Sequence, residues 1–215
     1  SFACLLENHP IYLQTVELPW KERQHMNRKD EDKFVDQEKT QKKNTMTKEC
    51  IFTALLILME QKTYEEITIT DIAKRAGVSR MSYYRLYRSK DDILIQYFNE
   101  IFAELLNEIK NIEGISKYQF SLLVFQQAKE NERLLKAILR AKLYEMVLKC
   151  FIQYCSYLVE KIFDQELNPV TADYLIYEEA GRFSLLLLRW VERGMKESPE
   201  KMAKLMEQFE VNLTK

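Results

Sequence analysis

Glycine and proline are scarce in this chain, with only four of each among its 215 residues. Few helix breakers and few turn residues are therefore available, which argues against an all-β or loop-rich protein. Hydrophobic residues make up 47% of the chain, enough to bury a substantial core. Good helix formers recur throughout in long amphipathic patterns. We therefore expect an all-α protein with about nine helices.

Long apolar runs are missing as well. No stretch approaches the length of a membrane span, and the first residues lack the basic and apolar regions of a secretory signal. We expect a cytoplasmic protein with no membrane partner. No CxxC pair occurs, and a reducing compartment disfavours disulfides, so we expect buried free thiols at all four cysteines, which are Cys4, Cys50, Cys150 and Cys155.

Catalytic and metal-binding residue sets are also lacking. The only two histidines, His9 and His25, lie in the first 25 residues, so none remains for a site further along the chain. There is no glycine-rich phosphate-binding motif, no nucleophile with a base and no metal-ligand spacing. We therefore expect no enzyme activity, no cofactor and no metal, although a lone catalytic carboxylate stays open.

The first 40 residues differ from the rest. "ENHP" and "ELPW" interrupt any helix, and a charge-rich run follows them. We interpret residues 1–40 as an extension, either flexible or artefactual. Met26 lies inside this segment, so the sequence leaves open whether residues 1–25 are native and functional.

Three short helices are predicted after this extension. The first begins at Thr47 and has one apolar face, formed by Ile51, Ala54, Leu55, Leu58 and Met59. Thr70 with Asp71 supplies the cap of a second helix, which Gly77 ends. Ser79 caps a third helix that runs to about Arg88. A short helix, a glycine turn and another short helix form a helix-turn-helix pattern over residues 70–89.

Positive charge is concentrated in the same segment. Residues 39–90 contain 7 Lys and 4 Arg against 4 Glu and 1 Asp, a net charge of +6, so the remainder carries −7 of the total of −1. Helical spacing places Tyr83 and Tyr87 on the inner side of the third helix, where core packing is expected. The outer side then carries Met81, Tyr84, Arg85 and Arg88. A basic helix of this size suits the major groove of DNA, although a solvated basic face is the alternative.

The segment from Met46 to Leu94 resembles the DNA-binding domain of the tetracycline-repressor (TetR) family. The residues that match the family's pattern are Thr70, Ile72, Ala73, Ala76, Gly77, Val78, Ser79, Tyr83, Tyr84, Tyr87, Ser89, Lys90 and Leu94. The resemblance implies that Thr68, Ser82, Tyr84 and Lys90 contact phosphates and that Arg80, Met81 and Arg85 face base edges, with Thr70 and Ser79 also in the DNA-binding set. Leu86 departs from the family pattern, which removes one backbone contact.

The resemblance also implies a domain order. We expect a DNA-binding domain over residues 41–108 and a C-terminal effector-binding and dimerisation domain over residues 109–215. The stretch from Tyr177 to Met206 resembles the subgroup that contains regulators of dihydroxyacetone kinase operons. Pairing of the last two helices with those of a second subunit is typical of the family, so we expect a dimer interface at Gly181, Leu185 and Leu188.

An effector pocket is implied by the family alone. Aromatic residues of the C-terminal half are the candidate lining, although plain core packing is the alternative for each one. The candidates are Phe98, Phe102, Phe120, Phe125, Tyr144, Phe151 and Tyr154. We expect a homodimeric repressor of a palindromic operator, modulated by a small molecule. An activator, or a DNA-bound adaptor regulated by a protein partner, is the alternative.

Overall fold

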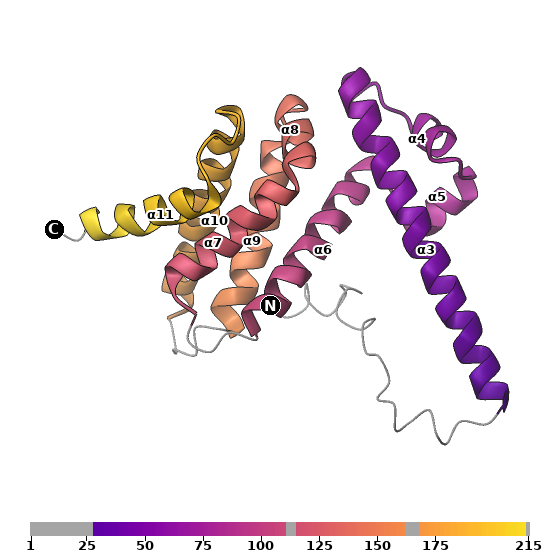
Figure 1. The fold of residues 1–215 in the computed structure, drawn as a ribbon, viewed down its shortest axis with the longest axis horizontal. Helices are drawn as coiled ribbons and strands as arrows, with labels where there is room; N and C mark the ends of the chain where they lie inside the picture. Colours follow the sequence, from indigo (N-terminus) through magenta and orange to yellow (C-terminus); the bar gives the residue numbers. More distant parts are fainter. Residues whose placement is uncertain (1–27, 111–114, 162–167, 214–215) are drawn as a thin grey trace. The chain divides into compact units, whose positions relative to one another are not determined.

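A computed structural model describes residues 28–110, 115–161 and 168–213 of the chain. Within these ranges it contains nine helices and no strand (Figure 1), so the prediction of an all-α fold is confirmed. No helix in the described ranges is long and apolar enough to cross a membrane. The helices are α3 (Arg28–Gln61), α4 (Ile69–Ala76), α5 (Arg80–Leu86), α6 (Lys90–Lys110), α7 (Lys117–Glu130), α8 (Glu132–Arg140), α9 (Tyr144–Lys161), α10 (Pro169–Glu192) and α11 (Pro199–Leu213).

The chain divides into a unit of residues 1–50 and a unit of residues 51–215. Helix α3 runs through this division and starts at Arg28, well before the predicted start at Thr47. The added turns are rich in Lys, Glu and Gln and contain no Gly or Pro, so helix propensity carries the helix upstream. The predicted boundaries at residues 40 and 108 stay predictions, and residues 1–25 lie outside the described ranges.

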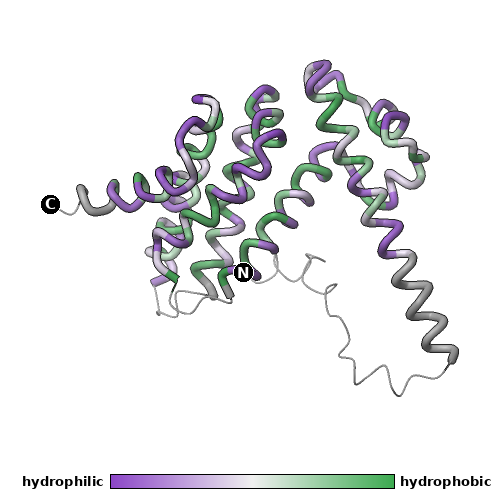
Figure 2. The backbone as a smooth tube through the Cα atoms, viewed as in Figure 1, coloured by the Kyte–Doolittle hydropathy of each residue, from purple (hydrophilic) through white to green (hydrophobic). Residues whose placement is uncertain are grey.

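The first helices of the second unit share a small core. Ile51 and Leu55 of α3, Ile72 of α4, Tyr83 of α5 and Leu94 of α6 are all fully buried. Each follows the apolar face that helical periodicity predicts for its own helix. In Figure 2, green and purple alternate along the helices, as expected for amphipathic elements. This core fixes how α4 and α5 are presented.

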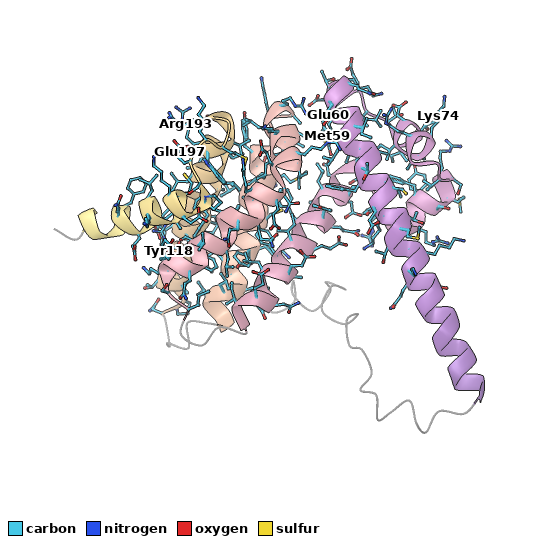
Figure 3. The ribbon with its side chains drawn as sticks, viewed as in Figure 1. Met59, Glu60, Lys74, Tyr118, Arg193 and Glu197 are labelled. Carbon is cyan, nitrogen blue, oxygen red and sulfur yellow. The ribbon has the colours of Figure 1, made fainter. Side chains whose placement is uncertain are left out.

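Helices α7 to α11 enclose a larger, aromatic core. Trp190 of α10 and Phe125 of α7 are almost fully buried, with ring centroids 5.4 Å apart in a T-shaped arrangement. The indole nitrogen of Trp190 donates a hydrogen bond of 3.2 Å to the carbonyl oxygen of Glu197. That bond fastens the turn between α10 and α11, where Figure 3 labels Arg193 and Glu197. Gly194 has a φ of 80° there, which suits glycine.

Local residues fix where two of the later helices begin. Asn168 caps α10 through its side-chain oxygen, and Pro169 occupies the first turn. Lys142 has a φ of 56°, which breaks the helical path, and α9 therefore starts at Tyr144.

The cysteines only partly match the prediction. Cys150 and Cys155 on α9 are buried free thiols, as expected, and burial raises the pKa of each to about 12. Cys50 is free but exposed, because it lies off the apolar face of α3. Cys4 lies outside the described residues.

Contacts also join the first helices to α8. Arg133 of α8 donates a hydrogen bond of 2.8 Å to the carboxylate of Glu60 near the end of α3, a residue labelled in Figure 3. The hydroxyl of Tyr97 on α6 lies 3.3 Å from the side-chain oxygen of Asn131, and its ring stacks on Phe52 of α3 at 3.6 Å. These polar contacts are partly solvated, so each contributes little to stability alone.

Candidate functional site

The start of α4 is fixed by a capping box. The hydroxyl of Thr68 accepts a hydrogen bond from the amide of Asp71, and the Asp71 carboxylate accepts one from the amide of Thr68. Lys62 donates to the same carboxylate at 2.7 Å, and with the bonds from Thr68 it holds the pKa of Asp71 well below its usual range. The cap is therefore Thr68 and not Thr70, which is exposed on the first turn.

Gly77 makes the turn between α4 and α5. Its φ of 68° lies in the left-handed region, and its amide donates to the carbonyl oxygens of Ala73 and Lys74. The amide of Val78 also donates to Ala73, at 3.0 Å, which closes the end of the helix. A Cβ at position 77 would have no neighbour within 4 Å, so backbone conformation, and not space, calls for glycine. The predicted end of the helix at Gly77 is confirmed.

Helix α5 is capped by Ser79 and held by two tyrosines. The Ser79 hydroxyl accepts from the amide of Ser82 at 3.0 Å and lies 3.0 Å from the Ser82 hydroxyl. Tyr83 is 0% exposed and Tyr87 is 4% exposed, and burial raises the pKa of both phenols. Their predicted core role is confirmed. They fix the rotation of α5 and therefore decide which side chains point outward.

The outer face of α5 presents the side chains that the sequence predicts. Met81 is 79% exposed and Tyr84 is 54% exposed, and Arg80 and Arg85 are exposed with them. Arginine can bind guanine with two hydrogen bonds, and methionine can pack on a thymine methyl group. The Tyr84 hydroxyl can donate to a phosphate. The exposed Met81 side chain takes no part in the buried core, and an apolar group among basic ones suits contact with a base edge.

Positive charge also extends onto α4. Lys74 and Arg75 occupy its last turn and are exposed, and Figure 3 shows Lys74 projecting outward from the helix. The predicted set omitted both residues, although they were part of the basic stretch. Their position suits the negative end of the helix dipole as well as a phosphate, and the sequence cannot separate those two roles.

Lys90 is placed differently from the expectation. Its ammonium group donates to the carbonyl oxygens of Tyr64, Glu65 and Ile67, the last at 3.2 Å. It also lies over the Tyr64 ring, 4.4 Å from the centroid. The Lys90 side chain therefore ties the segment after α3 to the start of α6. Lys90 was predicted to contact a phosphate, but its ammonium group donates to carbonyl oxygens of the protein itself.

A cavity of about 140 Å³ lies among α7, α9, α10 and α11. Its floor is buried and consists of Ser121, Cys155, Leu158, Phe183 and Met206, whereas Lys117 and Glu207 are exposed at the rim. Only Phe120 of the seven predicted ligand residues lines it.

The other six predicted ligand residues do not line this cavity. Phe98, Phe125, Phe151 and Tyr154 belong to the buried core, and Tyr144 is 41% exposed at the start of α9. Phe102 stacks on one side of this cluster against Tyr154, with ring centroids 4.6 Å apart, and Phe120 also stacks on Tyr154, with centroids 6.1 Å apart. Core packing explains these aromatics.

One ion pair stands in the cavity wall. Arg182 donates a hydrogen bond of 2.5 Å to the carboxylate of Glu179, one turn earlier on α10. Their side chains are only 19% and 25% exposed. Sequence reasoning missed both residues, because an i, i+3 ion pair on a helix is ordinarily a surface feature.

A row of exposed apolar side chains marks one face of α10. Val170, Tyr174, Tyr177 and Leu185 are 64%, 72%, 57% and 70% exposed and recur at helical spacing. Gly181 lies within this row, and a Cβ there would meet nothing within 4 Å. Leu188, which was predicted to join Gly181 and Leu185, is 7% exposed and belongs to the subunit's own core. We refer to the row from Val170 to Leu185 as the α10 face.

Two family models match the chain. One is described as "Bacterial regulatory proteins, tetR family" and matches residues 51–97. The other is described as "Transcriptional regulator C-terminal region" and matches residues 116–210. Together they take in both the α4–α5 segment and the helices around the cavity.

Similar proteins agree with these models. The HTH-type dhaKLM operon transcriptional activator DhaS of Lactococcus lactis subsp. lactis (strain IL1403) is 28% identical over 127 residues, which are 58% of this chain and 65% of that protein. The match thus spans slightly less than two thirds of that relative. A solved structure of the dihydroxyacetone kinase operon activator DhaS aligns with a TM-score of 0.51 at 19% identity, over 78% of this chain and 95% of the other. Lin0861 from Listeria innocua aligns with a TM-score of 0.69 at 15% identity, over 80% and 92%. The two structural likenesses are likenesses of fold.

Proposed function

Because this chain belongs to the TetR family of bacterial transcriptional regulators, we propose that it binds operator DNA as a homodimer and represses the adjacent genes. Its relatives are regulators, and it is a regulator rather than an enzyme. The observation that carries the DNA-binding proposal is the outer face of α5. This function would place the protein in the bacterial cytoplasm, where operator DNA is found.

Helix α5 is the recognition helix of this proposal. Buried Tyr83 and Tyr87 anchor its inner side, so Arg80, Met81 and Tyr84 project together from the other side. Arg80 stands in the first turn, the end of a recognition helix that enters the major groove most deeply. Met81 adds an apolar contact for a thymine methyl group, and Tyr84 adds a phosphate contact.

The α10 face supplies the dimer interface in this proposal. Four large apolar side chains exposed along one helix are more than the surface of a monomeric protein needs. Two-fold pairing would bury this row on both subunits and bring Gly181 of each helix close to the other subunit. The same symmetry would set two copies of α5 about one DNA turn, roughly 34 Å, apart.

A small-molecule effector is the third part of the proposal. The cavity among α7, α9, α10 and α11 has a mainly apolar lining with a few polar side chains, among them the pair of Glu179 and Arg182, and this composition is usual for ligand sites. Bound there, an effector would alter operator affinity if it favoured one arrangement of the subunit over another.

Activation is the second candidate mode of regulation. It is favoured by the similarity to DhaS, which is named a transcriptional activator. A reporter gene placed behind a bound sequence separates the two modes. Expression that rises on deletion of the protein supports repression, and expression that falls supports activation.

The DNA-binding proposal is tested by a matched pair of charge removals. Arg80→Ala should weaken binding to a selected operator by about 1 to 3 kcal/mol while leaving binding to random DNA nearly unchanged. Arg193→Ala removes the same charge from the exposed turn after α10 and should change neither. Equal losses for Arg80→Ala on operator and random DNA would make Arg80 a phosphate contact. Equal losses for both variants on the operator would remove α5 from the interface.

A further inference from the structure

We propose that the cavity beneath α10 binds an uncharged, mainly apolar molecule, and that its occupation strengthens the dimer. This inference rests on the homodimer proposed above, formed through the α10 face. It adds the chemical class of the effector and names α10 as the helix on which the effector acts. Three observations carry it: how α10 is supported, the size of the cavity and the balance of charge around it.

The first half of α10 is only partly covered by the rest of the subunit, with Ile176 half-buried against the core. No residue from 168 to 179 is buried, and Ala180 is the first buried position of the helix. Leu175 and Glu179, on the inner side of this half, line the cavity. The same half carries Val170 and Tyr174, which belong to the α10 face. The dimer surface is therefore backed by an incompletely filled space.

The size of the cavity sets the size of its ligand. An apolar protein cavity of about 150 Å³ is large enough to hold benzene. The present cavity has about 140 Å³. It suits a six-membered ring or an aliphatic chain of similar volume, and its exposed rim leaves room for a short polar substituent.

The charges around the cavity select against an ionic ligand. Among the residues that the structure describes, its lining contains two cationic residues, Lys117 and Arg182, and two anionic ones, Glu179 and Glu207. Arg182 and Glu179 are already paired with each other. A charged group in the buried part of the cavity would have to separate this pair or lie in a mainly apolar space away from the rim residues Lys117 and Glu207, and both cost free energy. An uncharged molecule with one hydroxyl or carbonyl group meets neither cost.

Filling the cavity would act on the dimer through α10. A ligand in contact with Leu175 on one side and with Cys155 and Phe183 on the other would supply the packing that the first half of α10 lacks. An α10 face that the ligand has already ordered loses less conformational freedom when the subunits pair, so the ligand strengthens the dimer. By linkage, the dimer then binds the ligand more tightly than the monomer does. Among the described lining residues, none belongs to helix α6, which follows the helix-turn-helix directly.

Three probes of one size but different charge test the ligand class. Benzyl alcohol, benzoate and benzylamine are each added to the full chain, and thermal unfolding and the dimer dissociation constant are measured. Benzyl alcohol should raise the unfolding temperature and lower the dissociation constant roughly 5- to 10-fold, the lower end of typical coupling between sites. Benzoate and benzylamine should have much smaller effects. Equal or larger effects of a charged probe would overturn the charge argument, and no effect of any probe would overturn the site.

A matched pair of variants tests the location. Leu175→Phe places a larger side chain in the cavity from α10, so the dimer should be tighter without a probe and should respond less to benzyl alcohol. Ile176→Phe makes the same kind of change at the next residue, which packs against the core and does not line the cavity, and should keep the wild-type response to benzyl alcohol. A full response in Leu175→Phe would place the site elsewhere. The wild-type probe series decides the inference even if a variant does not fold.

Ligand binding, dimer formation and DNA binding are measured separately. Binding of benzyl alcohol without a change in the dimer dissociation constant would overturn the coupling and leave the dimer intact. A chain that stays monomeric at every concentration, with or without a probe, would overturn the homodimer itself. Binding to selected operator DNA, measured without any probe, reports on α5 separately.

Discussion

Glutamate at Leu185 should separate the subunits without unfolding either of them. Leu185 is 70% exposed on the α10 face, so the fold of one subunit does not depend on its burial. Leu188 lies one turn further along the helix but is 7% exposed. Glutamate at Leu188 places a carboxylate inside the subunit's own core, and that variant should lose its helical structure.

The size of the Leu185 effect follows from its exposed fraction. Complete burial of a leucine side chain contributes about 1.5 to 3 kcal/mol. With 70% of the residue left to be buried on pairing, each copy contributes about 1 to 2 kcal/mol and the two copies of a dimer about 2 to 4 kcal/mol. Leu185→Glu should therefore raise the dimer dissociation constant about 30- to 1,000-fold, and desolvation of the carboxylate adds to this.

Sedimentation velocity and circular dichroism measure the two consequences. The Leu185→Glu chain should sediment as a monomer at concentrations where the wild type is dimeric, with an unchanged helical spectrum. It should also lose operator affinity, since each half-site is read by one subunit. Wild-type dimer affinity in Leu185→Glu would refute the assignment of the α10 face. A fully folded Leu188→Glu chain would refute the distinction between the two leucines.

Three further predictions concern stability. Gly77→Ala should lower the free energy of unfolding by about 1 to 2 kcal/mol, and Gly77→Asn by less, since only the backbone conformation is strained; shifts of the urea midpoint check this. Lys90→Met should lower the urea midpoint, because the Lys90 ammonium group binds protein carbonyls, and it should leave the salt dependence of DNA binding nearly unchanged. A flatter salt dependence in this variant would place Lys90 in the DNA interface. Burial raises the pKa of Tyr83 and raises the pKa of Cys155 from 9.0 to about 12, so the folded state retains protons that the unfolded chain releases. The free energy of unfolding should be steady below about pH 9 and fall as pH rises from there to about 12; denaturant titrations that show no fall would refute this.

Local patterns in the sequence predicted the α4–α5 segment well. Gly77 ends a helix because few other residues adopt its backbone conformation, and Ser79 caps α5 because its hydroxyl reaches the amide of Ser82. The burial of Tyr83 and the exposure of Tyr84 follow from helical periodicity alone. The cap of α4 was misplaced by two residues, since both Thr68 and Thr70 are threonines and only the box with Asp71 separates them.

The cavity was beyond prediction because it depends on contacts between distant segments. Its lining comes from four helices and from Ile115 and Ser116 just before α7, and no local pattern says which of their faces meet. Glu179 and Arg182 resemble a surface pair in the sequence and become a cavity wall only once α9 and α11 are placed. Leu188 was misassigned for the same reason, since its spacing from Leu185 says nothing of what covers it.

Selection of bound DNA from a random pool tests whether the chain reads an operator as a homodimer through α5. A homodimer that reads bases through α5 should enrich an inverted repeat whose half-sites are centred about one turn of DNA, roughly 34 Å, or a multiple of this apart. The same selection with Arg80→Ala should lose preference at one base pair of each half-site while keeping the repeat. A pool that stays random would rule out sequence-specific binding, and a single asymmetric site would rule out reading by a two-fold dimer.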